Sequence, residues 1–368
     1  MRILYGVNGE GMGHATRSRV VIDHLLSDHD VQVVASGAAY EYLSQSLPRV
    51  EQIFGPTFAM REGQIQRWAT VVGNLRKVGR ELPHTVREWL ARVHEWRPEV
   101  VITDFEPLAA LYARHAHSPL IAVDNINMLD RCRHDTEIIG AEREDFRIAK
   151  AVTHSMVGGA NEYVVTTFFR PAVSRQRTTL VPPIVRPEIE AATAERGDHL
   201  VVYSSGDPVL LDALRASGVP CRVYGMRGGP EADTQEGNLE FRPRSNDGFV
   251  EDLRTSAGVV AGGGFSLLSE AVYLGKPVLA IPLRGQFEQL MNARYLEREG
   301  FGLCAERVDD ETVRAFLAGL DEFEAALAGY EQDGNAFTLE TIERLAREVA
   351  AEDARELRRG RRLARRPA

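Results

Sequence analysis

The sequence predicts an α/β protein with two Rossmann-like domains, each built on a parallel sheet. An apolar run, a glycine-rich turn and a helical pattern follow one another at residues 2–26, and the same order returns at residues 258–274. Between these two units, Pro182, Pro183, Pro187 and the polar stretch 188–198 are typical of a linker. A chain of 368 residues is long enough for two domains with separate cores.

Composition narrows the class of protein. A hydrophobic content of 44% with 7% aromatic residues is typical of a globular protein, and the net charge of −9 argues against a general nucleic-acid binder. No apolar run approaches the length of a membrane span, and the chain begins without a secretory signal, so we expect a cytoplasmic protein. Cys132, Cys221 and Cys304 match no metal-ligand spacing and are expected to be reduced thiols.

The first half begins with an expected strand at 2–7, a glycine loop at 8–14 and a helix at 15–26. Its glycines follow G-x-G-x-G, and the next expected strand, 31–35, ends at Ser36-Gly37 where a dinucleotide site has an acid, so a dehydrogenase is disfavoured. Expected strands at 98–104 and 119–123 lead to Asp104 and Asp124, with a helix at 108–117 between them. Because the carboxyl ends of parallel strands form the ligand edge, His14 could meet either acid there.

The stretch 54–97 carries a helical pattern at 71–96, and its tryptophans are candidates for an acceptor pocket or, in the simpler interpretation, for helix packing. Expected strands at 163–168 and 179–181 complete the first half. The second half opens with expected strands at 199–203, 219–224 and 239–242, and with a helix at 209–217.

The stretch 258–300 is the most informative part of the chain. An expected strand at 258–261 runs through three glycines into a helix at 265–274 that Gly275 can cap. The first-turn N–H groups of such a helix, together with its dipole, are suited to a phosphate, and Glu270 is placed to accept from a neighbouring diol. After a strand at 278–282, Glu288 and Gln289 open the next helix with groups that suit sugar hydroxyls. Further elements are expected at 302–305, 309–330 and 337–350.

The ordered pattern in this stretch consists of Gly264, Ser266, Glu270, Gly275-Lys276-Pro277, Glu288-Gln289 and Asn292-Ala293. It resembles the donor-binding half of nucleotide-sugar glycosyltransferases of the GT-B fold, in particular MurG-like and UDP-glycosyltransferase-like members. The resemblance implies two facing Rossmann-like domains with parallel sheets and an interdomain cleft. It places an acceptor-binding domain at 1–185, a donor-binding domain at 186–350 and an Arg-rich tail at 351–368, and it implies that the last helix returns to the first domain.

The resemblance also assigns roles to residues. It implies that Glu270 holds the ribose, that Glu288 and Gln289 contact the donor sugar, and that Arg242 lies at the nucleobase. The implied donor site comprises Ser205, Gly206, Arg242, Gly263, Gly264, Phe265, Ser266, Glu270, Glu288 and Gln289. On the acceptor side it implies His14 as the catalytic base, oriented by Asp104, with Asp124 as the open alternative. The loop before His14 consists of Glu10, Gly11, Met12 and Gly13.

The implied reaction is inverting, metal-independent transfer of a sugar from a nucleoside-diphosphate sugar, with uridine as the first expectation, to a hydroxyl of a small or lipid-linked acceptor. No cofactor is expected. Glu288 stands where many members of the family have Asp or Gln, which leaves the sugar open. Two alternatives share the fold: a nucleotide-sugar 2-epimerase, and a nucleotide-sugar-binding protein without catalysis. Residues 355–368 hold seven arginines and one glutamate, and they form either a solvated helix extension or a peripheral contact with anionic lipid at the inner face of the membrane.

Overall fold

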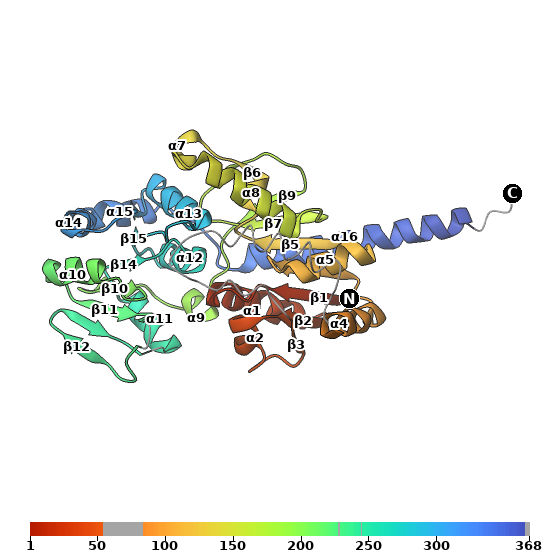
Figure 1. Ribbon diagram of the computed structural model, residues 1–368, viewed down its shortest axis with the longest axis horizontal. Helices are drawn as coiled ribbons and strands as arrows, with labels where there is room; N and C mark the ends of the chain where they lie inside the picture. The colour runs from red at the N-terminus through yellow and green to blue at the C-terminus, as the bar shows by residue number, and fades with distance from the viewer. Residues whose placement is uncertain (54–83, 227–228, 244, 365–368) are drawn as a thin grey trace. The chain divides into compact units, whose positions relative to one another are not determined.

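The computed structural model describes residues 1–53, 84–226, 229–243 and 245–364, and the chain forms two compact units (Figure 1). The first unit comprises residues 1–133, 144–182 and 335–368, and the second comprises residues 134–143 and 183–334. The expected domain ranges were 1–185, 186–350 and 351–368. In the structure the second unit begins at residue 183 and also includes residues 134–143, and the last helix belongs with the first unit, to which it was expected to return.

The first unit is built on a seven-stranded sheet in the order β3-β2-β1-β4-β5-β7-β9, with every pairing parallel. β4 and β5 are buried at every residue, as expected for central strands that helices cover on both faces. The strands are β1 (Arg2–Val7), β2 (Asp30–Ala35), β3 (Val50–Gln52), β4 (Val100–Asp104), β5 (Leu120–Asp124), β7 (Glu162–Thr166) and β9 (Thr178–Val181). Two short strands, β6 (Cys132–Arg133) and β8 (Ala172–Val173), form an antiparallel pair.

The helices of the first unit are α1 (Met12–Leu26), α2 (Gly37–Leu43), α4 (His84–Trp96), α5 (Pro107–Ala116), α6 (Met128–Arg131), α8 (Arg143–Val157) and α16 (Ala336–Ala364). The start of α1 lies three residues before the start that the sequence predicts. α4 covers part of the helical pattern expected at 71–96, whereas Trp68 and the rest of that pattern lie outside the described residues. The carboxylate of Glu106 caps α5 by accepting from the N–H groups of Leu108 and Ala109, at 2.9 and 2.6 Å.

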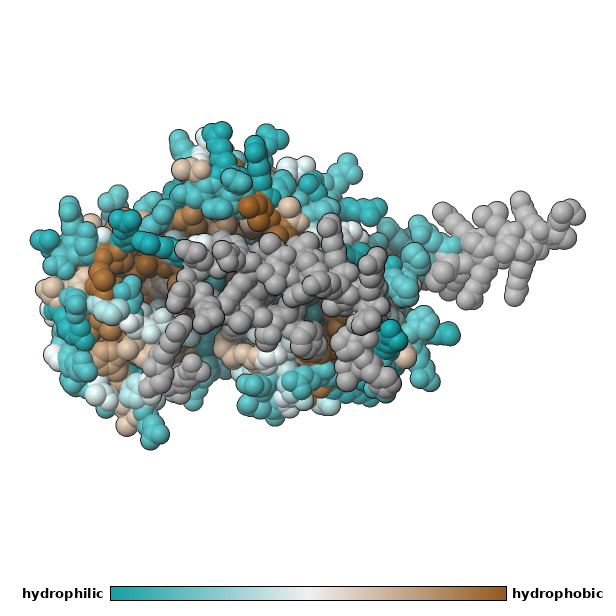
Figure 2. Space-filling view, viewed as in Figure 1, coloured by the Kyte–Doolittle hydropathy of each residue, from teal (hydrophilic) through white to brown (hydrophobic). Residues whose placement is uncertain are grey.

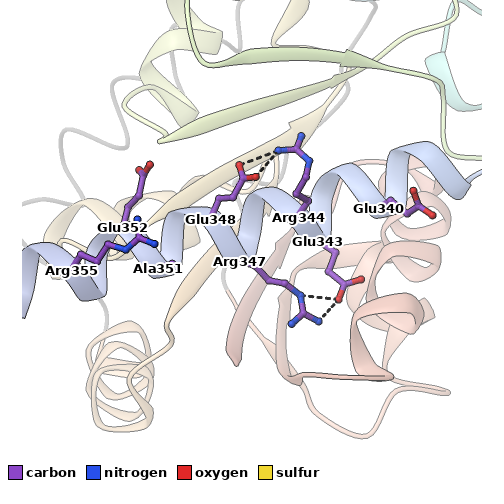
Figure 3. Close-up of a pocket in the computed structure, with 8 residues that line it drawn as sticks. All are labelled: Glu340, Glu343, Arg344, Arg347, Glu348, Ala351, Glu352 and Arg355. Carbon is purple, nitrogen blue, oxygen red and sulfur yellow. Dashed lines mark hydrogen bonds and ion pairs between the residues drawn. The ribbon is translucent and has the colours of Figure 1, made fainter.

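Helix α16 packs on the first unit through Ile342, Leu345, Ala346 and Val349, all of which are buried. Another part of its surface lines a hollow of about 500 Å³ (Figure 3). The residues around it all belong to α16: Glu340, Glu343, Arg344, Arg347, Glu348, Ala351, Glu352 and Arg355. Four of them form the ion pairs Arg344–Glu348 and Arg347–Glu343. None of the site residues predicted from the sequence lines this hollow, so we place no functional site there.

The second unit also has a seven-stranded sheet, in the order β12-β13-β11-β10-β14-β15-β16, and only the edge strand β12 pairs antiparallel. Its strands are β10 (Leu200–Tyr203), β11 (Cys221–Tyr224), β12 (Thr234–Glu236), β13 (Leu239–Phe241), β14 (Gly258–Ala261), β15 (Val278–Ala280) and β16 (Gly302–Cys304). Its helices are α7 (Thr136–Ile139), α9 (Pro187–Glu190), α10 (Pro208–Ser217), α11 (Asn246–Arg254), α12 (Phe265–Tyr273), α13 (Phe287–Arg298), α14 (Asp310–Ala318) and α15 (Leu320–Leu327).

Side-chain contacts explain why residues 134–143 belong to the second unit. Arg294 of α13 donates to the carbonyls of Ile138 and Ile139 at the end of α7, at 3.0 and 2.8 Å. His134 Nδ1 lies 2.7 Å from the hydroxyl of Tyr295. The single helix expected at 309–330 is instead two helices that meet at Gly319.

The surface is mostly hydrophilic in the view of Figure 2, with hydrophobic patches between the charged side chains. Three large apolar side chains of the second unit are about half exposed or more: Tyr203, Val209 and Leu283. All three lie at or just beyond the carboxyl ends of β10 and β15. Within the described residues, no helix combines the length and the apolar character that crossing a bilayer requires.

Candidate active site

The glycine loop of the first unit is tied to the carboxyl end of β4. The backbone N–H of Asn8 donates to the Asp104 carbonyl at 3.1 Å, and its side-chain amide donates to the Phe105 carbonyl at 3.0 Å. Asn8 also accepts from the N–H of Glu10 at 2.8 Å. Gly11 has a φ of 75° at the start of α1, a conformation that favours glycine. The predicted acceptor-side loop, Glu10 to Gly13, therefore lies at the carboxyl edge of the first sheet.

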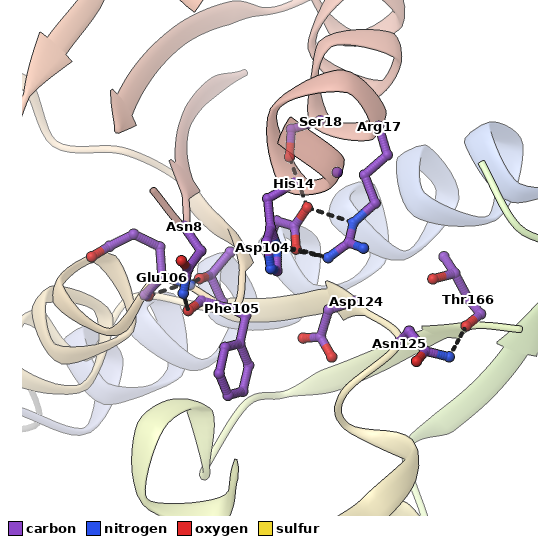
Figure 4. Close-up of polar contacts among 12 residues, drawn as sticks. Asn8, His14, Arg17, Ser18, Asp104, Phe105, Glu106, Asp124, Asn125 and Thr166 are labelled. Carbon is purple, nitrogen blue, oxygen red and sulfur yellow. Dashed lines mark hydrogen bonds and ion pairs between the residues drawn. The ribbon is translucent and has the colours of Figure 1, made fainter. Parts of the chain in front are cut away.

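His14 and Asp104 meet at this edge (Figure 4). His14 Nδ1 lies 2.8 Å from Asp104 Oδ1, and the two side chains are 15% and 1% exposed. Asp124, the alternative partner, instead accepts from the backbone N–H and the side-chain amide of Asn127, both at 2.7 Å. The structure thus places Asp104, and not Asp124, against His14.

Two further residues of α1 bind the same carboxylate, and the sequence prediction missed both. Arg17 Nε donates to Asp104 Oδ2 at 2.7 Å, its Nη2 donates to Oδ1, and the hydroxyl of Ser18 donates to Oδ2 at 2.9 Å. His14, Arg17 and Ser18 stand at positions i, i+3 and i+4 of one helix, so they share a face. This i, i+3, i+4 spacing is the feature of the sequence that could have indicated that Arg17 and Ser18 lie beside His14.

Burial and charge give the carboxyls at this edge different protonation states. Burial alone would raise the pKa of Asp104, but the charge of Arg17 and the contact with His14 hold that pKa well below its usual range. Burial raises the pKa of Asp124 to about 7, against the opposing hydrogen bonds from Asn127. Burial likewise raises the pKa of Glu106 to about 7, against its bonds to the N–H groups of Ala109 and Leu108. Of the three acids, Asp104 is the one held firmly ionised at neutral pH.

In the second unit, two of the three glycines after β14, Gly263 and Gly264, have different surroundings. A Cβ on Gly263 would lie 2.2 Å from the backbone oxygen of Gln289, and Asn292 donates to the Gly263 carbonyl at 3.1 Å. Gly263 is therefore required by the close approach of α13. Gly264, which precedes α12, has no capping side chain, and a Cβ there would meet no atom within 4 Å. The open position beside the start of α12 is thus at Gly264, as a phosphate site requires.

Two of the predicted donor residues near this turn need a more specific description. The side chain of Phe265 is buried at 4% exposure, so only its backbone can face a ligand. Glu270 is also buried, and both of its carboxylate oxygens accept from Arg186, at 2.6 and 2.7 Å. Arg186 in turn lies 5.7 Å above the ring of Phe249. The sequence prediction missed Arg186, because no local pattern links it to an acid 84 residues away.

The other predicted donor residues differ in exposure and in the hydrogen bonds that they already make within the protein. Ser205 is exposed after β10, and Gly206 has a φ of 99° and donates its N–H to the hydroxyl of Ser204. Arg242 donates its N–H to the Val223 carbonyl at 2.9 Å, and its guanidinium pairs with Asp233 and Glu240. Its backbone N–H and side chain therefore serve the β11–β13 pairing and the β12–β13 hairpin, and its place at the nucleobase stays a prediction.

The amide of Gln289 is bonded within its own loop. Its Oε1 accepts from the N–H of Leu283 at 3.1 Å, and its Nε2 donates to Gln286 Oε1 at 2.5 Å. Glu288 is half-buried in the first turn of α13. Gln289 thus fixes the loop between β15 and α13, and the contacts of Glu288 and Gln289 with the donor sugar stay predictions.

Two Rossmann-like sheets, each with a glycine turn and polar groups at its carboxyl edge, are the arrangement expected of a GT-B glycosyltransferase. The family model described as "Glycosyl transferase family 1" matches residues 1–321, and the chain belongs to that family. It is therefore a glycosyltransferase, as the sequence pattern predicted.

Relatives and solved structures agree with this membership. The chain is 24% identical to an "Uncharacterized glycosyltransferase" of Methanosarcina acetivorans over 341 residues, which covers 82% of this chain and 85% of that protein. It is 26% identical over 234 residues, 55% of this chain and 65% of that protein, to a UDP-N-acetylglucosamine–N-acetylmuramyl-(pentapeptide) pyrophosphoryl-undecaprenol N-acetylglucosamine transferase of Bacillus thuringiensis.

Two solved structures share the fold over nearly their whole length. The glycotransferase of kitacinnamycin aligns with a TM-score of 0.68 and 16% identity, covering 93% of this chain and 98% of that one. UGT2 of Phytolacca americana, complexed with UDP-2fluoro-glucose and pterostilbene, aligns with a TM-score of 0.64 and 14% identity, covering 94% and 98%. These similarities establish the GT-B fold predicted from the sequence.

Proposed function

We propose that this glycosyltransferase moves a sugar from a nucleoside-diphosphate sugar, with UDP as the first candidate, to a hydroxyl group of its acceptor, with inversion and without a metal ion. The observation that carries the proposal is the hydrogen bond between His14 and the buried, ionised Asp104 at the carboxyl edge of the first sheet. The UDP-N-acetylglucosamine named for the Bacillus relative and the UDP-sugar in the Phytolacca structure support uridine. A structure of a spinosyn rhamnosyltransferase with thymidine diphosphate keeps thymidine as the competing base.

The proposed step begins with proton transfer to His14. When Nδ1–H donates to Asp104, the lone pair of Nε2 can accept the proton of the acceptor hydroxyl. The acceptor oxygen then forms a bond to the anomeric carbon while the bond from that carbon to the diphosphate oxygen breaks. The bonding electrons leave on the diphosphate, and attack from the face opposite the leaving group inverts the anomeric centre.

In this proposal the second unit binds the donor. The first turn of α12 after Gly264 would receive the diphosphate, because its backbone N–H groups and its dipole stabilise the charge that develops on the leaving group. Glu270 would accept from the ribose hydroxyls. A carboxylate has about four lone-pair directions, and Arg186 takes one on each oxygen, so two remain for the diol. Arg186 thereby orients the acid that holds the ribose.

The test is ligand-induced thermal stabilisation with UDP-, TDP- and GDP-sugars, measured on the wild type, on Glu270→Gln and on Arg294→Gln. A ligand at a hundredfold excess over its Kd raises the free energy of unfolding by about 2.7 kcal/mol. We expect one nucleotide to stabilise the wild type and Arg294→Gln, each against its own baseline, and to have a much smaller effect on Glu270→Gln. Arg294 is a suitable control because it anchors α7 in the same unit.

The nucleotide found in this way is then used to test catalysis. Incubation with an acceptor panel should release the nucleoside diphosphate and give a glycoside of inverted configuration, whereas His14→Gln should bind donor without turnover. A 2-epimerase would convert the donor sugar without any acceptor, and a binding protein would show neither product nor any effect of His14→Gln on turnover. Stabilisation by none of the three nucleotides would contradict the assigned donor site.

A further inference from the structure

Arg17 is a buried charged side chain of the first-unit site to which the proposed reaction gives no task. It is 7% exposed and makes two parallel hydrogen bonds to Asp104, from Nε to Oδ2 and from Nη2 to Oδ1. With the bonds from His14 and Ser18, each oxygen of Asp104 accepts two hydrogen bonds. The carboxylate therefore cannot rotate without breaking the fork that Arg17 presents to it.

The same guanidinium competes with Asp104 for His14. Arg17 Nη2 and Asp104 Oδ1 each lie 2.8 Å from His14 Nδ1. A ring nitrogen donates when it carries a proton and accepts when it does not, so Nδ1 can satisfy only one of them at a time. Arg17 can only donate, so Asp104 is the one of these two partners that can accept a proton carried by Nδ1. When Nδ1 carries the proton, Nε2 is the nitrogen with the lone pair.

We propose that Arg17 is a positioning residue for the His14–Asp104 pair. It holds Asp104 so that Oδ1 receives the Nδ1–H of His14, and Nε2 keeps the lone pair that takes the proton of the acceptor. Without Arg17 the carboxylate of Asp104 could rotate, and Nδ1 would lose its fixed acceptor. The inference rests on the proposed role of His14 as the base, but its test requires no turnover.

Other titratable groups face this cluster from neighbouring strands. Tyr5 of β1 is buried, and burial with the nearby charge of Asp104 raises its pKa above its usual range, so it stays protonated. Asp124 at the end of β5 interacts with Asp104, and burial raises the pKa of Asp124 to about 7. Since Asp124 titrates near neutrality, the measurement is made both in the native background and in Asp124→Asn.

The experiment follows the imidazole nitrogens by NMR in protein labelled with ¹⁵N-histidine, with the His14 signals identified by their loss in His14→Gln. In the wild type at pH 8 we expect the proton on Nδ1. In Arg17→Gln we expect the proton to be shared between Nδ1 and Nε2, because the carboxylate of Asp104 is no longer held in one orientation. Arg17→Lys keeps one charge-assisted bond to the carboxylate and should keep more of the proton on Nδ1 than Arg17→Gln does.

Arg19→Gln is the matched control, because it removes a positive charge from the same helix at a partly exposed position paired with Asp23. It should leave the proton on Nδ1. A ring in Arg17→Gln with its proton still wholly on Nδ1, or a wild-type ring with its proton on Nε2, would overturn the proposal. If Arg17→Gln does not fold, the tautomers of the wild type and of Arg17→Lys decide the question. The expected NMR result without any nucleotide binding would refute the proposed function and leave the role of Arg17 intact.

Discussion

The buried ion pair between Arg186 and Glu270 provides a prediction that can be worked out quantitatively. The two side chains are 14% and 7% exposed, and two short hydrogen bonds join them. The perturbation is a double-mutant cycle of Glu270→Gln, Arg186→Gln and the pair of substitutions together. Each single substitution leaves one charge buried without its counter-charge, whereas the double substitution leaves two amides that can bond to each other.

Removal of one partner of a buried ion pair typically costs about 3–5 kcal/mol. Because Gln keeps part of the hydrogen bonding, we expect the lower end, about 3 kcal/mol, for each single variant. The double variant should cost about the same as one single variant, so the coupling energy should be about 3 kcal/mol. For a unit of this size, each kcal/mol lowers Tm by about 2–4 °C, so each single variant should unfold roughly 6–12 °C lower.

The assay is denaturant and thermal unfolding followed by far-UV circular dichroism. Trp89 and Trp96 belong to the first unit, so their fluorescence reports on that unit. In each single variant, the circular dichroism transition of the destabilised second unit should therefore occur at lower temperature or denaturant concentration than the fluorescence transition. Arg254→Gln is the control, because Arg254 and Glu251 pair at the surface of the same unit with side chains 25% and 57% exposed, and such pairs contribute about 0–1 kcal/mol.

Additive single effects, or single effects as small as that of Arg254→Gln, would refute the reasoning. They would mean that Arg186 is free to turn away from Glu270, and the assignment of Arg186 as the residue that orients the ribose-binding acid would be lost with it.

Three further predictions concern chelation and pH. EDTA should leave transferase activity largely intact, because the start of α12 is proposed to stabilise the leaving group; complete loss that Mg²⁺ or Mn²⁺ restores would contradict this. Burial raises the folded-state pKa of Asp124 to about 7, so its contribution to stability is present below pH 4 and is lost as pH rises to 7. In urea unfolding, Asp124→Asn should remove part of the decline in the free energy of unfolding over this pH range. An unchanged decline with pH in Asp124→Asn would count against the prediction. Burial lowers the pKa of Lys276 to about 8, so above that pH the unfolded state binds more protons than the folded state. The free energy of unfolding should therefore rise between pH 8 and 10 in the wild type but not in Lys276→Met. An equal rise in Lys276→Met would contradict the assignment.

The sequence by itself determined the repeated local units of this protein. β1 and β14 have the bounds that the apolar runs predict, and Gly275 has the φ of 64° that a glycine after a helix adopts. These features follow from neighbouring residues alone, because side-chain periodicity and glycine conformation act over a few positions. The family pattern in 258–300 rests on the same short range, and it was sufficient to predict a glycosyltransferase.

The tertiary structure alone decided which side chains meet. Asp104 and Asp124 follow similar strands, and only the positions of β1, β4 and α1 bring Asp104 to His14 and Arg17. Arg186 and Glu270 are separated by 84 residues, and Gly263 is a packing glycine because α13 returns against it. The contacts of the last helix and of residues 134–143 likewise depend on distant surfaces. Local periodicity predicts which face of a helix or strand is apolar. Which other helix or strand packs against that face depends on the folded chain.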